Sequence, residues 1–176
     1  MNIDFTNINY LKEGNERQQR AYEVLTKLCI FENLRAYQPL LTGTIPIEID
    51  LPESDLDIIC SCSDHTKFKE KLRSLYSIHN HFEIHTDTWN GVVSTVATFH
   101  VDEFEIEIFR QDCPSEQQNA YKHMIIEHAI LCKKDDEFRK EIIGLKKAGM
   151  KTEPAFAKLL GLDGNPYEAL LNLTLT

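Results

Sequence analysis

The chain has 176 residues and a formal net charge of −9, with 42% hydrophobic and 27% charged residues. This length predicts one domain, with room for a small helical appendage, and it suffices to bury a core without disulfides. The composition is that of a globular protein and argues against disorder. The acidic balance disfavours a general DNA- or RNA-binding role, because the surface would repel phosphate backbones.

The N-terminal residues and the cysteines favour a cytoplasmic protein with no membrane contact. The first fifteen residues, MNIDFTNINYLKEGN, show neither the basic start nor the apolar core of a signal peptide. No apolar run is long enough to cross a bilayer. None of the five cysteines forms a CxxC pair, which is typical of thiols in a reducing compartment. Cys60 and Cys62 therefore predict a strand end with small residues rather than a metal-binding fragment.

Hydrophobic spacing predicts alternating helices and strands over the first 76 residues. Residues such as Tyr22 and Leu25 recur at helical spacing between charged positions. Prolines and polar residues interrupt the stretch after Gly43, and Ser63 or Asp64 is a suitable N-cap for a later helix. In chain order we expect a helix over 15–36, a short apolar run over 40–42, a loop or irregular edge strand over 45–54, a strand over 55–62 and a helix over 65–76.

The next third of the chain has the pattern of a β-meander. Asn90-Gly91 separates two alternating segments, residues 79–89 and 92–101, and this dipeptide is a strong hairpin-turn signal. Asp102-Glu103 predicts a second turn, followed by a strand over residues 104–109. We therefore expect three consecutive strands here.

Helix signals dominate the C-terminal third. Pro114 and Ser115 would open a long helix that ends near Lys134. The remaining signals predict Asp135 as the cap of a helix ending at Gly149, and Thr152 and Asn165 as caps of two short helices, with Pro166 at a first helical position. The predicted fold class is α+β, a mixed sheet with helices packed on it, followed by a helical part. We expect an α/β core over 1–112 and a helical region over 113–176 packed on it.

Two aspartates at the start of a predicted core strand suggest a metal site. Residues two apart in a strand point the same way, so Asp55 and Asp57 project together while Leu56 and Ile58 face the other side. Neighbouring carboxylates repel unless a positive charge lies between them. A hard divalent cation such as Mg²⁺ takes oxygen ligands and keeps open positions for phosphate oxygens.

A third carboxylate is available from the strand over 104–109. Glutamates alternate with apolar residues there and share one face, which would lie beside Asp55 and Asp57 if the strands are neighbours. Glu107 is our choice, because it is flanked most deeply by apolar residues, and Glu105 is the alternative. Three carboxylates would complete a two-metal site. An ordinary half-exposed strand shows the same alternation, so the pattern alone also fits a solvated sheet face.

These motifs resemble the signature of the nucleotidyltransferase-fold (polymerase-β-like) superfamily. That signature is a glycine and a small hydroxyl residue, about ten residues, and a D-x-D between apolar residues, which Gly43-Thr44 and residues 55–58 match. A later strand carries the third acid. The segments QQNAYKHMIIEH and KKAGMKTEPAFAKLLGL further resemble a bacterial family of unknown function that is usually grouped with these enzymes.

The resemblance implies a role for each matching residue. Gly43 would let the backbone approach a triphosphate, and Thr44, where the superfamily usually has serine, would offer its hydroxyl and amide. Asp55 and Asp57 would hold Mg²⁺, and Glu107 would share the metal and help to deprotonate the attacking hydroxyl. No basic residue is obviously placed for the triphosphate. The candidates are Arg110, Lys122, Lys147 and Lys151.

Two histidine-containing patterns offer other readings. His79, His81, Glu83 and His85 alternate and could bind zinc or iron, although ligands along one strand reach a common ion poorly. His123 and Glu127 lie four apart on a predicted helix. They would form an ordinary surface pair or line an active-site cleft, and the first of these is favoured.

Three functions follow from these patterns. The first is a Mg²⁺-dependent nucleotidyltransferase that moves a nucleoside monophosphate from an NTP to a hydroxyl of a small molecule or protein. The second is a non-catalytic, antitoxin-like binding protein on the same fold. The third is an unrelated metal protein that uses the histidine strand. An acidic surface makes a polynucleotide acceptor unattractive.

Overall fold

The computed structural model describes residues 3–89 and 91–174 and contains one five-stranded sheet. Its strand order is β1-β2-β5-β4-β3. β2 and β5 run parallel and the other neighbouring pairs run antiparallel, so the sheet is mixed, as predicted. The strands are β1 (Leu40–Thr42), β2 (Leu56–Ser61), β3 (Asn80–Trp89), β4 (Val92–Val101) and β5 (Phe104–Gln111).

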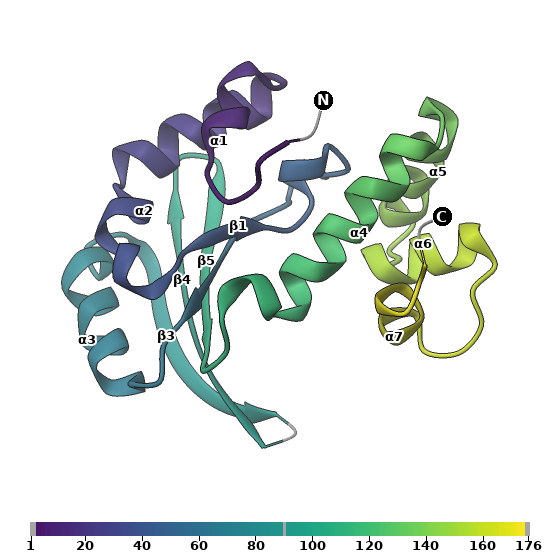
Figure 1. The fold of residues 1–176 in the computed structure, drawn as a ribbon. Coiled ribbons are helices and arrows are strands. Elements are labelled where there is room, and N and C mark those ends of the chain that lie inside the picture. The colour runs from purple at the N-terminus through teal and green to yellow at the C-terminus, as the bar shows by residue number, and fades with distance from the viewer. Residues whose placement is uncertain (1–2, 90, 175–176) are drawn as a thin grey trace.

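Three N-terminal helices cover one face of this sheet (Figure 1). They are α1 (Glu16–Lys27), α2 (Ile30–Asn33) and α3 (His65–Tyr76). Strand alternation turns Leu56 and Ile58 of β2, and Ile106 and Ile108 of β5, toward these helices, and all four are fully buried. Burial of this face fixes the register, because a slip of one residue would expose every one of these side chains.

Four helices form a separate half beside the sheet (Figure 1). Phe138, Ile142 and Phe156 are buried in a second hydrophobic core there. α4 runs from the end of the sheet into this half and so connects the two cores. The helices are α4 (Asn119–Lys133), α5 (Asp136–Lys147), α6 (Thr152–Leu160) and α7 (Pro166–Leu171). In the part of the chain that the structure describes, no helix has the length and apolar character needed to span a bilayer.

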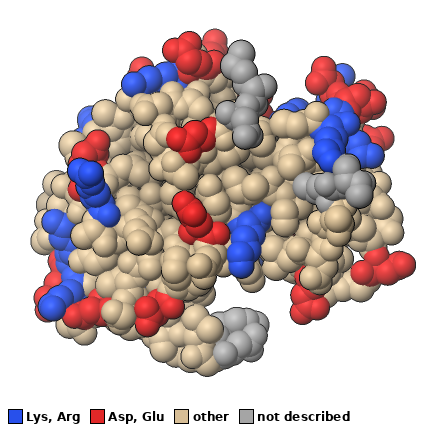
Figure 2. All heavy atoms as spheres, viewed as in Figure 1, with Lys and Arg blue, Asp and Glu red and all other residues tan. Residues whose placement is uncertain are grey.

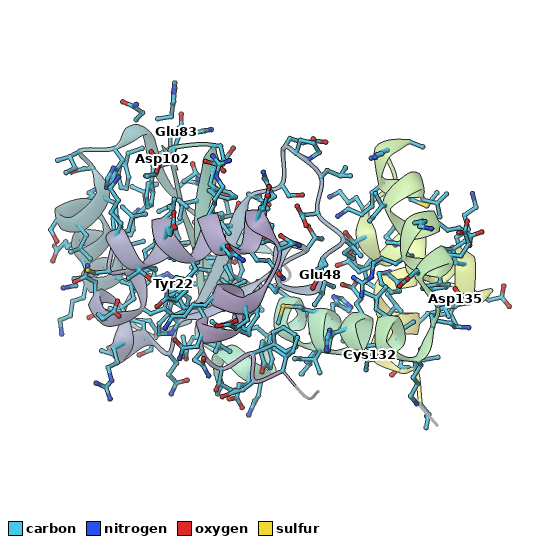
Figure 3. The ribbon with its side chains drawn as sticks, turned by 90° about the horizontal axis from the view of Figure 1, so that it is seen from above. Tyr22, Glu48, Glu83, Asp102, Cys132 and Asp135 are labelled. Carbon is cyan, nitrogen blue, oxygen red and sulfur yellow. The ribbon has the colours of Figure 1, made fainter. Side chains whose placement is uncertain are left out.

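The loop between β1 and β2 contacts both halves of the molecule: Ile45 is buried in the core beside the sheet, and Arg17 of α1 donates to the carbonyl of Ser54. Ile47 and Ile49 are buried in the second core, and Figure 3 shows Glu48 between the sheet and the C-terminal helices. The Arg139 guanidinium donates to the Ile47 carbonyl (2.6 Å), and the Lys146 ammonium donates to the Ile49 carbonyl (2.6 Å). α5 thus holds the segment that leads into β2.

The structure corrects several predicted boundaries. The helix expected over 15–36 ends at Lys27, because Cys29 adopts a left-handed conformation (φ 50°) and the chain restarts as α2. This break lets Ile30 and Leu34 enter the core. The helix expected from Pro114 begins at Asn119, after a 3-10 turn, and Lys151 rather than Thr152 is the N-cap residue of α6.

Other expectations are confirmed. The segment 45–54 is a loop that opens with the 3-10 turn Ile45–Ile47. The side chains of Asp64, Asp135 and Asn165 accept capping hydrogen bonds at the starts of α3, α5 and α7. β3 and β4 form the predicted hairpin. Asn90 of its turn lies outside the described residues.

Candidate functional site

The pairing of β2 with β5 brings three carboxylates together. Asp57 and Glu107 are direct register partners across the parallel pair, and Asp55 immediately precedes β2. One carboxylate oxygen of each of the three residues lies within 4.8 Å of the others, and all three side chains are partly buried. No other group of three His, Cys, Asp or Glu residues meets this geometry within residues 3–89 and 91–174. The expected convergence is therefore observed, on the sheet face that the N-terminal helices leave uncovered.

No ion pair within residues 3–89 and 91–174 neutralises these carboxylates, although Lys146 interacts electrostatically with Asp55. Burial raises the pKa of Asp57 well above its ordinary value, and the charges of Asp55 and Glu107 raise it further. The pKa of Glu107 is likewise raised, first by burial and then by Asp55 and Glu105. Crowded oxygen donors are the donor set that Mg²⁺ prefers.

The structure distinguishes between the two candidate glutamates. Glu105 points to the same sheet face as Glu107, but it is exposed and lies outside the carboxylate group. Its Oε2 is 3.5 Å from Nε2 of His100 instead. Glu107 is the glutamate that joins Asp55 and Asp57.

Gly43 lies against the carboxylate of Asp57. It follows β1, where Thr42 pairs with Asp57, and has a left-handed conformation (φ +84°). A Cβ at this position would be 2.3 Å from Oδ2 of Asp57, which is far inside van der Waals contact. Glycine is thus required twice, once by the backbone conformation and once by the close carboxylate.

We expect Gly43→Ala to destabilise the fold by about 1–3 kcal/mol, because alanine is strained at positive φ and displaces Asp57. Urea denaturation would measure this loss. The same substitution should weaken any divalent-ion stabilisation of the protein. Gly164→Ala is the matched control, since Gly164 has a similar φ (+86°) but open space at its Cβ position. An equal loss in both variants, with divalent-ion binding retained in Gly43→Ala, would mean that the contact with Asp57 is unimportant.

Thr44 is tied to the segment that carries Asp55. Its hydroxyl donates to Oγ of Ser54 (3.3 Å), and that oxygen also accepts from the backbone amide of Leu51 (2.9 Å). The Gly43-Thr44 turn and the approach to Asp55 are therefore held side by side. Both line the same cleft as the carboxylates.

The carboxylates line a cleft of about 560 Å³ between the open sheet face and the C-terminal helices. Ile59 and Phe109 extend its floor along β2 and β5. Figure 2 shows an acidic and a basic group next to each other where the two halves of the molecule meet. The remaining lining comes from the end of β1, the segment before β2, the helices α4 and α5, and the start of α6, namely Thr42, Ser54, Ala120, His123, Met124, Glu127, Lys146, Lys151, Thr152 and Glu153.

His123 and Glu127 are cleft residues, and the favoured expectation of a surface pair is wrong. They are 6% and 4% exposed, because α4 packs against β1 and against α7. His123 Nε2 is 2.9 Å from the Tyr167 carbonyl oxygen, and its Nδ1 is 3.5 Å from the Glu153 carboxylate. Burial, reinforced by the charge of Glu153, raises the pKa of Glu127 to about 8.

Two lysines reach the cleft, and sequence reasoning identified only one of them. Lys151 was a candidate, whereas Lys146 was missed. Lys146 lies one helical turn after Ile142 on the buried side of α5, and this spacing separates it from Lys147. The other candidates lie elsewhere. Arg110 is buried on the helix-covered sheet face beside His65, and Lys122 and Lys147 are exposed.

The histidine strand does not form a metal site in the described chain. A register shift between Asn80 and Glu83 breaks the alternation on which that hypothesis depended. The His79 ring stacks on Phe99, whereas the His81 ring contacts His100. The histidines are thus separated by the bulge.

Three solved structures are similar to this chain in fold. These are a cytoplasmic RNA terminal U-transferase (14% identity, TM-score 0.50, covering 79% of this chain and 43% of that one), the Cid1 poly(U) polymerase with Mg 3′-dATP bound (13%, 0.53, 79% and 45%), and the GLD-2/RNP-8 complex (12%, 0.55, 86% and 60%). The chain spans about half the length of these proteins. At such identity the likeness shows the nucleotidyltransferase fold alone.

Comparison at the sequence level gives a family without an assigned activity. No curated protein matches the chain. The family model described as "Domain of unknown function (DUF4269)" matches residues 23–173, which covers both the carboxylate strands and the C-terminal helices. The chain therefore belongs to the DUF4269 family and has the nucleotidyltransferase (polymerase-β-like) fold.

Proposed function

We propose that this protein is a Mg²⁺-dependent nucleotidyltransferase that moves a nucleoside monophosphate from an NTP to a hydroxyl of a small molecule or protein. The observation that carries the proposal is the convergence of Asp55, Asp57 and Glu107 beside the Gly43-Thr44 turn. The fold shared with terminal uridylyltransferases supports it. So does the similar structure that was solved with Mg 3′-dATP bound.

The three carboxylates would hold the metal. When bound, Mg²⁺ supplies charge neutralisation for the phosphates and the transition state. The Gly43-Thr44 turn lines the cleft beside the carboxylates, and Thr44 would offer its hydroxyl and amide to a phosphate there. Lys146 and Lys151, the lysines in the cleft lining, would add positive charge for the triphosphate.

The reaction requires positioning more than covalent chemistry by the protein. The acceptor oxygen attacks the α-phosphorus, a new P–O bond forms, and the bond to the departing pyrophosphate breaks. Glu107 would receive the acceptor proton, and the cleft walls would hold the acceptor in line for attack.

The proposal also covers the kind of acceptor and the roles of the two regions of the chain. A net charge of −9 favours a small molecule or a protein side chain over a polynucleotide. The RNA activity in the names of the similar structures remains a property of those proteins. Residues 1–112 would provide the catalytic core, and residues 113–176 would close the cleft over it, with the loop before β2 held by α5.

A labelled-transfer assay tests this function. Purified protein, Mg²⁺ and each NTP labelled at the α-phosphate would be incubated with a metabolite extract and, separately, with candidate protein acceptors. We expect labelled product and pyrophosphate release only with Mg²⁺ and an acceptor, because water is a poorly positioned nucleophile. If no NTP binds at millimolar concentration with Mg²⁺ or Mn²⁺, a non-catalytic binding protein is the better description.

A further inference from the structure

The cleft wall that faces the carboxylates carries an acidic group that the proposed reaction does not use. Glu127 projects from α4, and Glu153 lies in the first turn of α6. Both line the same cleft as Asp55, Asp57 and Glu107. We refer to Glu127 and Glu153, together with His123, whose Nδ1 is 3.5 Å from the Glu153 carboxylate, as the acidic wall.

Glu127 is a buried cleft residue with an unsatisfied carboxyl oxygen. It is 4% exposed, and its Oε1 has no hydrogen-bond partner among the residues that the structure describes. A buried polar oxygen is normally satisfied, because leaving it unpaired costs the full desolvation of that group. Since Glu127 also lines the cleft, a group entering the cleft would lie beside this buried carboxyl group.

The nearby cations do not fully neutralise the negative charge of the acidic wall. Lys146 is close enough to influence Glu127 electrostatically, but its ammonium donates to the Ile49 carbonyl at 2.6 Å. His123 Nδ1 is 3.5 Å from Glu153, and no ion pair in the described chain includes Glu127. The cleft therefore has five carboxyl groups against two lysines.

We propose that the acidic wall binds a protonated amine, and that the acceptor is a small molecule carrying such an amine as well as the reacting hydroxyl. The acceptor part of this inference rests on the proposed nucleotidyl transfer. The amine site itself stands on the geometry of Glu127 and its neighbours. Ile59, Phe109 and Met124 in the lining offer apolar contacts for the carbon skeleton.

A cation suits this wall better than a neutral ligand does. Burial raises the pKa of Glu127 to about 8, so without a cation the acid is mostly protonated near pH 7. A bound ammonium would favour the carboxylate, and their hydrogen bond would be charge-assisted in a site shielded from water. The acceptor would thereby be held opposite the carboxylates of β2 and β5.

Two matched probes test the amine site directly. They are 1,3-diamino-2-propanol and glycerol, which share a skeleton but differ in the amines. Ligand-observed NMR titration would measure binding. It would be done in saturating Mg²⁺, so that the metal prevents the amine from binding to Asp55, Asp57 and Glu107. We expect the diamine to bind at least about tenfold more tightly than glycerol. We also expect Glu127→Gln to lower the affinity for the diamine at least about tenfold. Glu153→Gln should give a smaller loss, because its side chain is 23% exposed.

Glu141→Gln is the control, because it makes the same chemical change at an exposed position on α5. Thermal melts would establish that each variant is folded. Equal weakening by Glu127→Gln and Glu141→Gln would show general surface attraction and overturn the inference. Transfer to neutral acceptors, together with diamine binding that Glu127→Gln does not change, would support the proposed enzyme activity and contradict the amine site. Loss of diamine binding in Glu127→Gln, together with no transfer from any NTP, would support the amine site and contradict the proposed enzyme activity.

Discussion

Asp57→Asn is expected to abolish Mg²⁺-dependent nucleotidyl transfer while leaving the metal-free protein as stable as before or more stable. Asp57 lies within 4.8 Å of Asp55 and Glu107, and burial together with their charges raises its pKa well above the ordinary value. Removing its charge weakens the metal site, which provides several kcal/mol of transition-state stabilisation, so activity should fall at least about a thousandfold. The same change relieves repulsion and desolvation in the metal-free fold, worth about 1 kcal/mol.

Pyrophosphate release and thermal melts with and without Mg²⁺ would measure both effects. The wild type should gain stability with Mg²⁺, because a ligand that binds only the folded state stabilises it, whereas the variant should not. Asp163→Asn, an exposed loop substitution of the same kind, should behave as the wild type. A strongly destabilised Asp57→Asn variant that binds nucleotide normally would instead assign Asp57 a structural role.

Local patterns in the sequence were enough to predict the sheet and the carboxylate group. The D-x-D spacing places Asp55 and Asp57 on one face by the period of a strand alone. Alternation over residues 104–109 does the same for Glu107, and the Asn90-Gly91 turn orders the meander that returns β5 to the sheet. The parallel pairing of β2 with β5, on which the convergence depends, is set by the sheet topology and remained an open condition at the level of the sequence.

The opposite wall of the cleft could not be predicted in this way. Helical periodicity indicates which face of α4 or α5 is buried, but it does not indicate what covers that face. Glu127 and His123 look like a surface pair at i and i+4, and only the docking of the C-terminal helices makes them cleft residues. Lys146 shares an i, i+4 stripe with Ile142, a signal that was available but becomes meaningful only beside the sheet.

The break at Cys29 shows the same limit. Nothing in the local sequence marks this residue for a left-handed conformation, since it is neither glycine nor asparagine. Tertiary packing determines where the helix ends, because a continuous helix would carry Ile30 and Leu34 away from the core in which they are fully buried. Packing thus overrides a helical pattern that is correct on either side of the break.

Glu127→Gln is expected to stabilise the protein at alkaline pH by about 3–5 kcal/mol. The pKa of Glu127 rises from 4.5, its ordinary value, to about 8 in the folded state, chiefly through burial. Between these values the folded state holds a proton that the unfolded state has lost, so the free energy of unfolding falls as pH rises. The contribution of Glu127 is complete below about pH 4.5 and is lost as pH passes through about 8, at roughly 1.4 kcal/mol per pH unit.

Urea denaturation of both forms between pH 5 and pH 9, on the order of one measurement per pH unit, would isolate this effect. Glutamine resembles the protonated acid at every pH, and the other titrating groups, including Asp57 and Glu107, contribute equally to both forms. The difference in unfolding free energy should therefore be small at the acidic end and should grow in favour of the variant toward the alkaline end. Glu141→Gln should give a flat difference, because Glu141 is exposed. A flat difference for Glu127→Gln as well would show that Glu127 is ionised and compensated in the folded protein at neutral pH, and that the acidic wall already has a counter-charge.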